Sequence, residues 1–85
     1  MKLTPTAIDA VWRVDLAPFD DARGRFVRTF DADVFRAHGL GATFIQSSIS
    51  QNRARATLRG VHYQLAPHEE TKLVRCSRGR VFDVA

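Results

Sequence analysis

Hydrophobic and polar residues alternate along most of this chain, which predicts β-strands. The alternation occurs at residues 11–16 and at residues 25–30, where Phe26, Arg28 and Phe30 fall on one face. It returns at residues 43–50, 56–64, 71–77 and 80–85. Because successive side chains of a strand point to opposite faces, each segment fits a strand that packs on one side.

One segment departs from the alternation and predicts a short helix at residues 32–38. The Asp31 carboxylate can accept hydrogen bonds from the unpaired amides of Asp33 or Val34, as the residue before a helix does. Gly39, directly after His38, fits the end of the helix. We therefore expect about two helical turns at this position.

The segments between the predicted strands read as turns. Ala17-Pro18 and the acidic pair Asp20-Asp21 predict a break after the first strand, and Arg78-Gly79 predicts a tight hairpin between the last two. Several short strands with one small helix indicate an all-β antiparallel sandwich or barrel. This small number of strands leaves sheet edges unpaired. We therefore expect half a barrel that further strands or a partner would close.

Composition is that of a soluble globular protein, with 45% apolar and 26% charged residues in 85. The length fits one domain or part of one. The net charge of +4 comes mostly from arginine, whose planar fork of donors suits phosphate and carboxylate. A diphosphate, a nucleic acid or an acidic protein would each satisfy this charge.

Other sequence signals are weak. Residues 1–10 lack the apolar core of a signal peptide and no stretch is long enough to span a membrane, so we expect a cytoplasmic protein. The single Cys76 excludes an internal disulfide and is expected to pack as a small apolar residue. His62 and His68 lack the close spacing of metal-binding histidines, so no metal or other cofactor is expected.

The most specific chemistry lies in residues 58–64, which read Leu-Arg-Gly-Val-His-Tyr-Gln. The imidazole of His62 can act as a general base, although a packed structural histidine is the simpler interpretation. Asp83 and Glu69 are the candidates to orient its ring. Arg59 and His62 have opposite strand parity, and a bulge at Gly60 would bring them to one face.

Further candidates are spread along the chain. Lys72 either lies in solvent or stands at the mouth of an inward face shared with Val74 and Cys76, where its ammonium could stabilise developing negative charge. Arg23 lies between Phe19 and Phe26, a grouping that can stack a base and hold its phosphate but also occurs in ordinary turns. A strand face with Gln46, Ser48 and Ser50 is either solvated or a polar pocket lining.

Taken in order, these segments resemble the dTDP-4-dehydrorhamnose 3,5-epimerase family. The resemblance covers nearly the whole chain and includes residues 5–8, 21–26, 44–46, 58–64, 67–68, 72–75 and 78–84. Its most specific part is the run Leu-Arg-Gly-x-His-Tyr-Gln at residues 58–64 followed by Lys72.

The resemblance implies a metal-free cupin-type jelly-roll β-sandwich that works as a homodimer on a dTDP-linked 4-keto-6-deoxy sugar. By resemblance, His62 is the base that removes a proton beside the ketone, and Lys72 helps to hold the enolate oxygen. Arg23 and Arg59 would hold the diphosphate. The residues implied at the nucleotide are Phe19, Phe26, Arg28, Gln46, Ser47 and Ser48.

Two positions depart from the family pattern on the nucleotide side. Arg28 stands where the family commonly has glutamate, which reverses a charge. Gln46-Ser47-Ser48 replaces Gln-Asp-Asn, which shortens two side chains. His62 and Lys72 match the pattern.

The chain stops at residue 85, inside a predicted strand. We therefore expect residues 1–85 to be the amino-terminal portion of one cupin-like domain and to be inactive alone. The resemblance places the family's proton-donating tyrosine and the aspartate that orients the histidine further along, and Tyr63 is not that tyrosine. The alternatives are an epimerase of one centre only, a nucleotide-sugar-binding cupin without catalysis, and a small basic nucleic-acid-binding domain. The arginines form no stripe, which places nucleic acid last.

Overall fold

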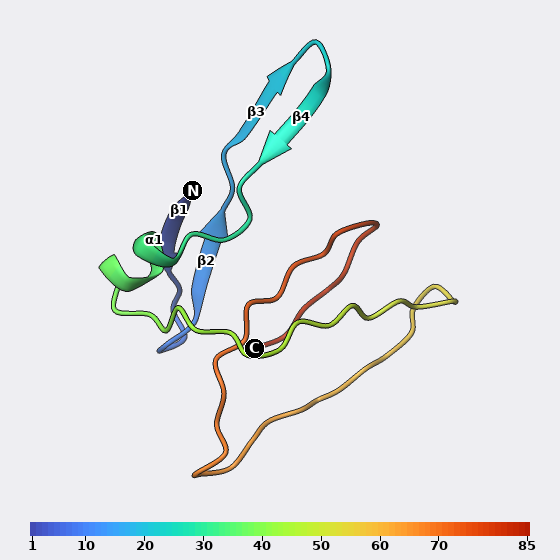
Figure 1. The fold of residues 1–85 in the computed structure, drawn as a ribbon. Helices are drawn as coiled ribbons and strands as arrows, with labels where there is room; N and C mark the ends of the chain where they lie inside the picture. Colours follow the sequence, from blue (N-terminus) through green and yellow to red (C-terminus); the bar gives the residue numbers. More distant parts are fainter. The chain divides into compact units, whose positions relative to one another are not determined.

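The computed structural model describes all residues from 1 to 85. Its regular structure consists of four strands and one helix: β1 (Lys2–Pro5), β2 (Trp12–Asp15), β3 (Pro18–Asp21), β4 (Gly24–Val27) and α1 (Ala32–Ala37) (Figure 1). Residues 1–43 with 80–85 form one compact unit and residues 44–79 form a second, and each is described separately. No helix is long and apolar enough to cross a membrane.

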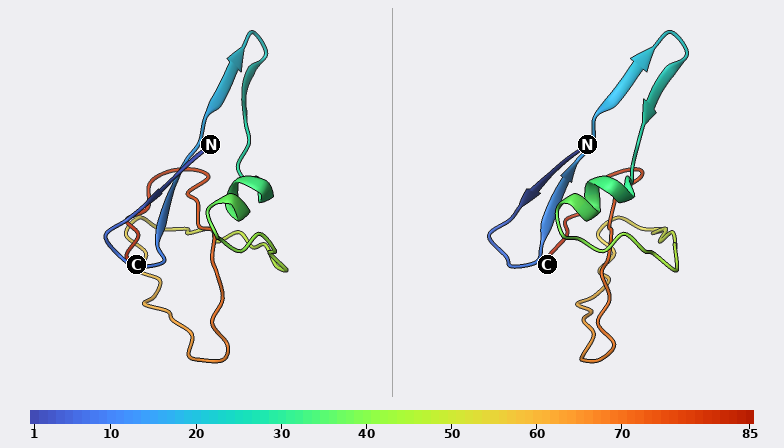
Figure 2. Two further views of the ribbon diagram at one scale, coloured as in Figure 1. Left: turned by 90° about the vertical axis from the view of Figure 1, so that its left-hand side faces the viewer. Right: turned by 60° about the vertical axis from the view of Figure 1, so that its left-hand side comes forward.

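The strands form two antiparallel pairs. β1 pairs with β2, with Leu3 opposite Val14, and β3 pairs with β4, with Phe19 opposite Phe26. Figure 2 shows the two pairs and α1 from two further sides. The predicted all-β character with one short helix agrees with this regular structure, in which every sheet is antiparallel.

Helix α1 begins at Ala32 as the sequence predicts and ends at Ala37, one residue before the predicted end. Asp31 Oδ1 accepts the amides of Asp33 at 3.1 Å and Val34 at 3.3 Å, so two amides of the first turn are paired. At the other end, Gly39 has a φ of 71°, which a glycine adopts at little cost. The amide of Leu40 bonds back to the carbonyl of Phe35 at 3.0 Å, which pairs a carbonyl of the last turn.

The first unit has a small core with one buried residue in α1 and one in β1. Phe35 is only 4% exposed, and Leu3 of β1 is the other buried apolar residue. The Phe35 ring meets Phe30 edge to face at a centroid distance of 5.0 Å, and Trp12 of β2 meets His38 in the same way at 5.7 Å. Aromatic pairs favour this edge-on geometry. The Trp12–His38 contact therefore links β2 to the residue that follows α1.

Several strand predictions are wrong. Residues 43–50, 56–64, 71–77 and 80–85 contain no strand, and Arg78-Gly79 forms a bend without paired strands. A backbone hydrogen bond within residues 44–79 joins the His68 amide to the Leu65 carbonyl and closes a turn. An alternating pattern supplies side chains for a covered face, but a strand also needs a neighbour that pairs its amides and carbonyls. These residues take part in neither of the two strand pairs.

The amino-terminal part shows the opposite error. Residues 2–5 were not predicted as a strand, yet they form β1 against β2. Pro18, Asp20 and Asp21 were interpreted as a break and a turn, yet they belong to β3. A proline is compatible with the first residue of an edge strand, because its missing amide then removes no bond of the ladder. The turn itself is shorter than predicted and contains only Ala22 and Arg23.

Asp31 has two roles at α1, since its carboxylate accepts the helix amides and also binds the Arg28 guanidinium, and two substitutions should separate them. The Arg28 guanidinium, followed by the helix amides, holds the pKa of Asp31 below its ordinary value of 3.8. Because the folded pKa is lowered, the stability that Asp31 supplies is present above pH 3.8 and is lost as the pH falls below it. Asp31→Ala should lower the helix population about fivefold at neutral pH, judged by Cα chemical shifts. Asp31→Asn should keep the helix and remove this acid transition, and an unchanged transition in Asp31→Asn would contradict the assignment.

Candidate functional site

The β3–β4 hairpin presents two aromatic rings side by side. Phe19 and Phe26 are directly opposite one another in the register, so both side chains lie on the same face of the hairpin. They are 65% and 70% exposed. Two exposed rings on a short, rigid hairpin form a surface on which a planar ring can stack.

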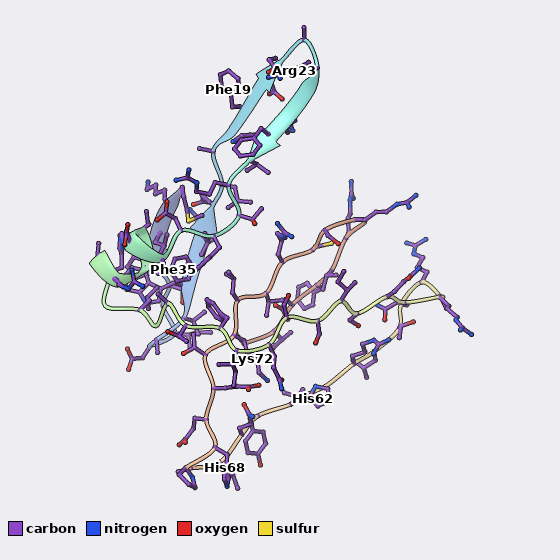
Figure 3. The ribbon with its side chains drawn as sticks, in the orientation of Figure 1. Phe19, Arg23, Phe35, His62, His68 and Lys72 are labelled. Atoms are coloured by element: carbon purple, nitrogen blue, oxygen red, sulfur yellow. The ribbon has the colours of Figure 1, made fainter.

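Arg23 occupies the two-residue turn of this hairpin, and Asp21 holds it (Figure 3). Asp21 Oδ1 accepts the Arg23 backbone amide at 2.8 Å, which fixes the turn. Asp21 Oδ2 accepts from Arg23 Nη2 at 2.6 Å and from Nε at 3.3 Å. This contact lowers the pKa of Asp21 and raises that of Arg23, so both groups stay charged at neutral pH.

A shallow, solvent-open hollow of about 290 Å³ lies at the tip of the hairpin. Its lining consists of Asp21, Arg23, Gly24, Arg25 and Phe26. This volume is at the small end for ligand pockets, so the tip can hold part of a ligand rather than enclose a whole one. The structure thus brings three of the predicted site residues together, namely Arg23, Phe19 and Phe26.

Arg28 lies between β4 and α1 and is bonded to the helix cap. Its Nη1 donates to Asp31 Oδ2 at 2.8 Å, and two thirds of its side chain is exposed. The arginine that departs from the family pattern therefore has a partner carboxylate three residues later. Its contact with a nucleotide stays a prediction.

His62 lies in the second unit, in an extended segment without regular structure. Its ring makes no hydrogen bond, so within residues 44–79 no carboxylate orients it. The neighbouring Gly60 has a φ of 116°, and a methyl group there would lie 3.7 Å from His62 Nδ1. The predicted bulge at Gly60 is wrong, because a bulge requires a paired strand.

Lys72 lies in the same unit and faces solvent. Its Nζ is 3.5 Å from Glu70 Oε1, an exposed ion pair of the kind that adds little stability. The predicted inward face is wrong in this structure, because Lys72, Val74 and Cys76 are all exposed. The Cys76 thiol instead donates to the Arg78 carbonyl at 3.3 Å. No hydrogen bond joins Lys72 to His62, although both lie in the extended part of the chain shown in Figure 3.

Arg59 is engaged locally. Its Nε donates to Asn52 Oδ1 at 2.6 Å and its Nη2 to the Gln51 carbonyl at 3.3 Å. The remaining predicted nucleotide contacts are exposed and make no side-chain hydrogen bonds; they are Gln46, Ser47 and Ser48. Their roles stay predictions.

Sequence reasoning missed Asp21 as a member of the site. It was interpreted only as part of an acidic turn, yet it makes more hydrogen bonds to Arg23 than any other residue does. The signal was present in the order Asp-Ala-Arg-Gly, because an aspartate two residues before an arginine in a tight turn can reach both its amide and its guanidinium.

Comparison with known proteins gives a consistent result. The model of the family described as dTDP-4-dehydrorhamnose 3,5-epimerase matches residues 5–85. A protein of that name from Shigella flexneri is 42% identical over all of this chain and 47% of its own length. One from Methanothermobacter thermautotrophicus is 38% identical over 99% of this chain and 44% of its own length. A dTDP-4-dehydrorhamnose 3-epimerase from Streptomyces niveus is 35% identical over 99% of this chain and 41% of its own length.

No solved structure matches the chain. The chain spans about half the length of the curated relatives that it matches. The family match nevertheless covers every segment on which the resemblance rested, including residues 58–64 and Lys72. The chain belongs to the dTDP-4-dehydrorhamnose 3,5-epimerase family.

Proposed function

We propose that the whole protein is an epimerase that acts on a dTDP-linked 4-keto-6-deoxy sugar. The observation that carries this proposal is the family match over residues 5–85. Relatives named for the activity align with the entire chain, which supports it further. The segment that bears the base in this reading, residues 58–64, is intact.

The proposed chemistry is proton transfer beside a ketone. The carbonyl acidifies the hydrogens on its neighbouring carbons, so His62 as general base removes one and leaves an enolate. The Lys72 ammonium then stabilises the negative oxygen, and return of a proton to the opposite face inverts the carbon. Within this proposal both side chains need free access to the sugar, which agrees with their exposure in residues 44–79.

The nucleotide part of the substrate is assigned to the β3–β4 hairpin. The exposed rings of Phe19 and Phe26 offer a stacking surface for the base, and the Arg23 guanidinium at the turn offers charge for the diphosphate. Arg59 is assigned to the same diphosphate. The remaining contacts to the nucleotide are assigned to Arg28, Gln46, Ser47 and Ser48.

The proposal includes a cupin-type jelly-roll that works as a homodimer. Residues 44–79 carry large exposed apolar side chains, among them Ile45, Ile49 and Leu58. Such side chains are normally covered by other parts of a fold or by a partner. Their exposure in residues 44–79 supports a larger β-structure around the chain in the whole protein, and sedimentation of the whole protein measures the dimer.

Deuterium incorporation tests the proposed function. The whole protein, incubated in heavy water with a dTDP-4-keto-6-deoxy sugar, should place deuterium on the carbons beside the ketone, detected by NMR. Free dTDP without the sugar gives the binding control by calorimetry. A protein that binds dTDP but leaves every sugar proton in place would be a nucleotide-sugar-binding module and would contradict the epimerase proposal.

The number of labelled carbons decides between two kinds of epimerase. The relative from Streptomyces niveus is named a 3-epimerase, whereas the other relatives described above are named 3,5-epimerases. Deuterium at both carbons 3 and 5 would indicate the double reaction. Deuterium at carbon 3 alone would indicate the single one.

A further inference from the structure

The Arg23 guanidinium is bound along only one of its edges. Asp21 contacts Nε and Nη2, with the shortest distance of 2.6 Å to Nη2. Nη1 makes no hydrogen bond, and the side chain is 91% exposed. An arginine has five N–H donors in a fixed plane, so the edge formed by Nη1 and Nη2 stays open toward solvent. That edge has the geometry for a two-point contact with a phosphate.

The held arginine belongs to the aromatic face of the hairpin. Asp21 follows Phe19 by two positions in β3, so both residues lie on the same face, which also carries Phe26. The opposite face carries a second ion pair, in which Asp20 Oδ1 lies 2.7 Å from Arg25 Nε. The hairpin therefore has two similar Asp–Arg pairs, and only Asp21 has its side chain on the face that carries the two rings, whereas Asp20 lies on the opposite face and does not line the hollow.

We propose that Asp21 is a positioning residue that aims the open edge of Arg23 at the diphosphate of the substrate. The inference rests on the proposed function, because it takes the ligand of this hairpin to be a nucleoside diphosphate. An exposed arginine samples many rotamers, and ordering it costs conformational entropy when a ligand binds. Asp21 fixes the guanidinium before the ligand arrives, so less of that cost falls on binding.

The negative charge of Asp21 also opposes an incoming phosphate. This repulsion is the smaller effect, because Asp21 occupies the edge formed by Nε and Nη2, whereas the phosphate would contact the edge formed by Nη1 and Nη2. Charge interactions in water weaken with distance and with screening by salt. Asp21 also keeps its charge at neutral pH, since Arg23 lowers its pKa. The ion pair between Asp21 and Arg23 is therefore present at neutral pH.

The test compares two matched substitutions in the whole protein. Asp21→Asn keeps an oxygen for the Arg23 amide, which preserves the turn, but loses the ionic hold on the guanidinium. We expect dTDP binding, measured by calorimetry, to weaken about fivefold. Asp20→Asn removes the corresponding pair on the other face and should leave the dissociation constant within about twofold. For the sugar substrate, Asp21→Asn should raise KM and leave kcat unchanged.

Arg23→Ala separates the inference from the function on which it rests. Arg23→Ala should weaken dTDP binding more than Asp21→Asn does, and adding Asp21→Asn to Arg23→Ala should have no further effect. If Arg23→Ala leaves binding unchanged, the assignment of the diphosphate to this hairpin fails. If Arg23→Ala weakens binding but Asp21→Asn does not, only the positioning role fails. A further loss in the double variant would show that Asp21 acts on the fold instead, which also overturns the role.

Discussion

His62→Ala in the whole protein should lower the exchange of the sugar proton with solvent by at least about a hundredfold. The proposed reaction begins with removal of that proton, and no other histidine lies in the motif at residues 58–64. Binding of dTDP should remain within about twofold, because the base acts on the sugar and not on the nucleotide. Deuterium incorporation and calorimetry measure the two quantities separately.

His68→Ala is the matched control for this experiment. His68 lies in the same unit, is also exposed and is outside the family's specific run. The His68→Ala variant should exchange the sugar proton with solvent at the rate of the unmodified protein. Equal losses of binding and exchange in His62→Ala would identify a structural histidine, and loss of exchange in His68→Ala would show that the assay reports on stability.

Phe35→Ala should destabilise the protein by about 3–5 kcal/mol. Phe35 is the most buried residue of the chain, and its ring contacts Phe30 in the small core of the first unit. Its removal leaves a cavity in a core with few other members, so little surrounding material can fill it. Urea unfolding followed by tryptophan fluorescence measures the change, because Trp12 lies in the adjoining strand β2.

Phe26→Ala gives the control with the same change of side chain. Phe26 is largely exposed on the β3–β4 hairpin, where it faces Phe19. Its loss should cost less than about 1 kcal/mol. Comparable costs for the two phenylalanines would contradict the burial of Phe35 and the exposure of the hairpin face.

The accuracy of the sequence predictions depends on how local the interactions are. The helix was predicted well because its cap lies within three residues, from Asp31 to Val34, and its end lies beside a glycine with positive φ, Gly39. The strand predicted at residues 11–16 was confirmed as Trp12–Asp15, and the one predicted at residues 25–30 was confirmed only to Val27, since residues 28–30 are not strand. Each of these strands pairs with a segment a few residues away. The predictions at residues 43–85 depended on distant partners and were not confirmed as strands.

The candidate site follows the same division. The motif at residues 58–64 was sufficient to indicate the family, and the comparison confirmed it. Arg23, Phe19 and Phe26 were predicted as a group, and the hairpin places them together. The sequence did not reveal that Asp21 holds Arg23, because the acidic pair looked like a turn and the strand register was unknown. It also predicted that Cys76 packs inside, whereas Cys76 is exposed, and for Lys72 the solvent alternative is the one that the structure shows.

By itself, the sequence determined the family, the helix and the identity of the residues that are proposed to carry the chemistry. These depend on residue types at fixed spacing, which the chain carries whatever its tertiary structure. Only the tertiary structure decided that Phe19 and Phe26 share a face, and that one edge of Arg23 is held by Asp21. A strand face exists only once its register is set, and register is set by backbone pairing between segments rather than by the order of residues within one.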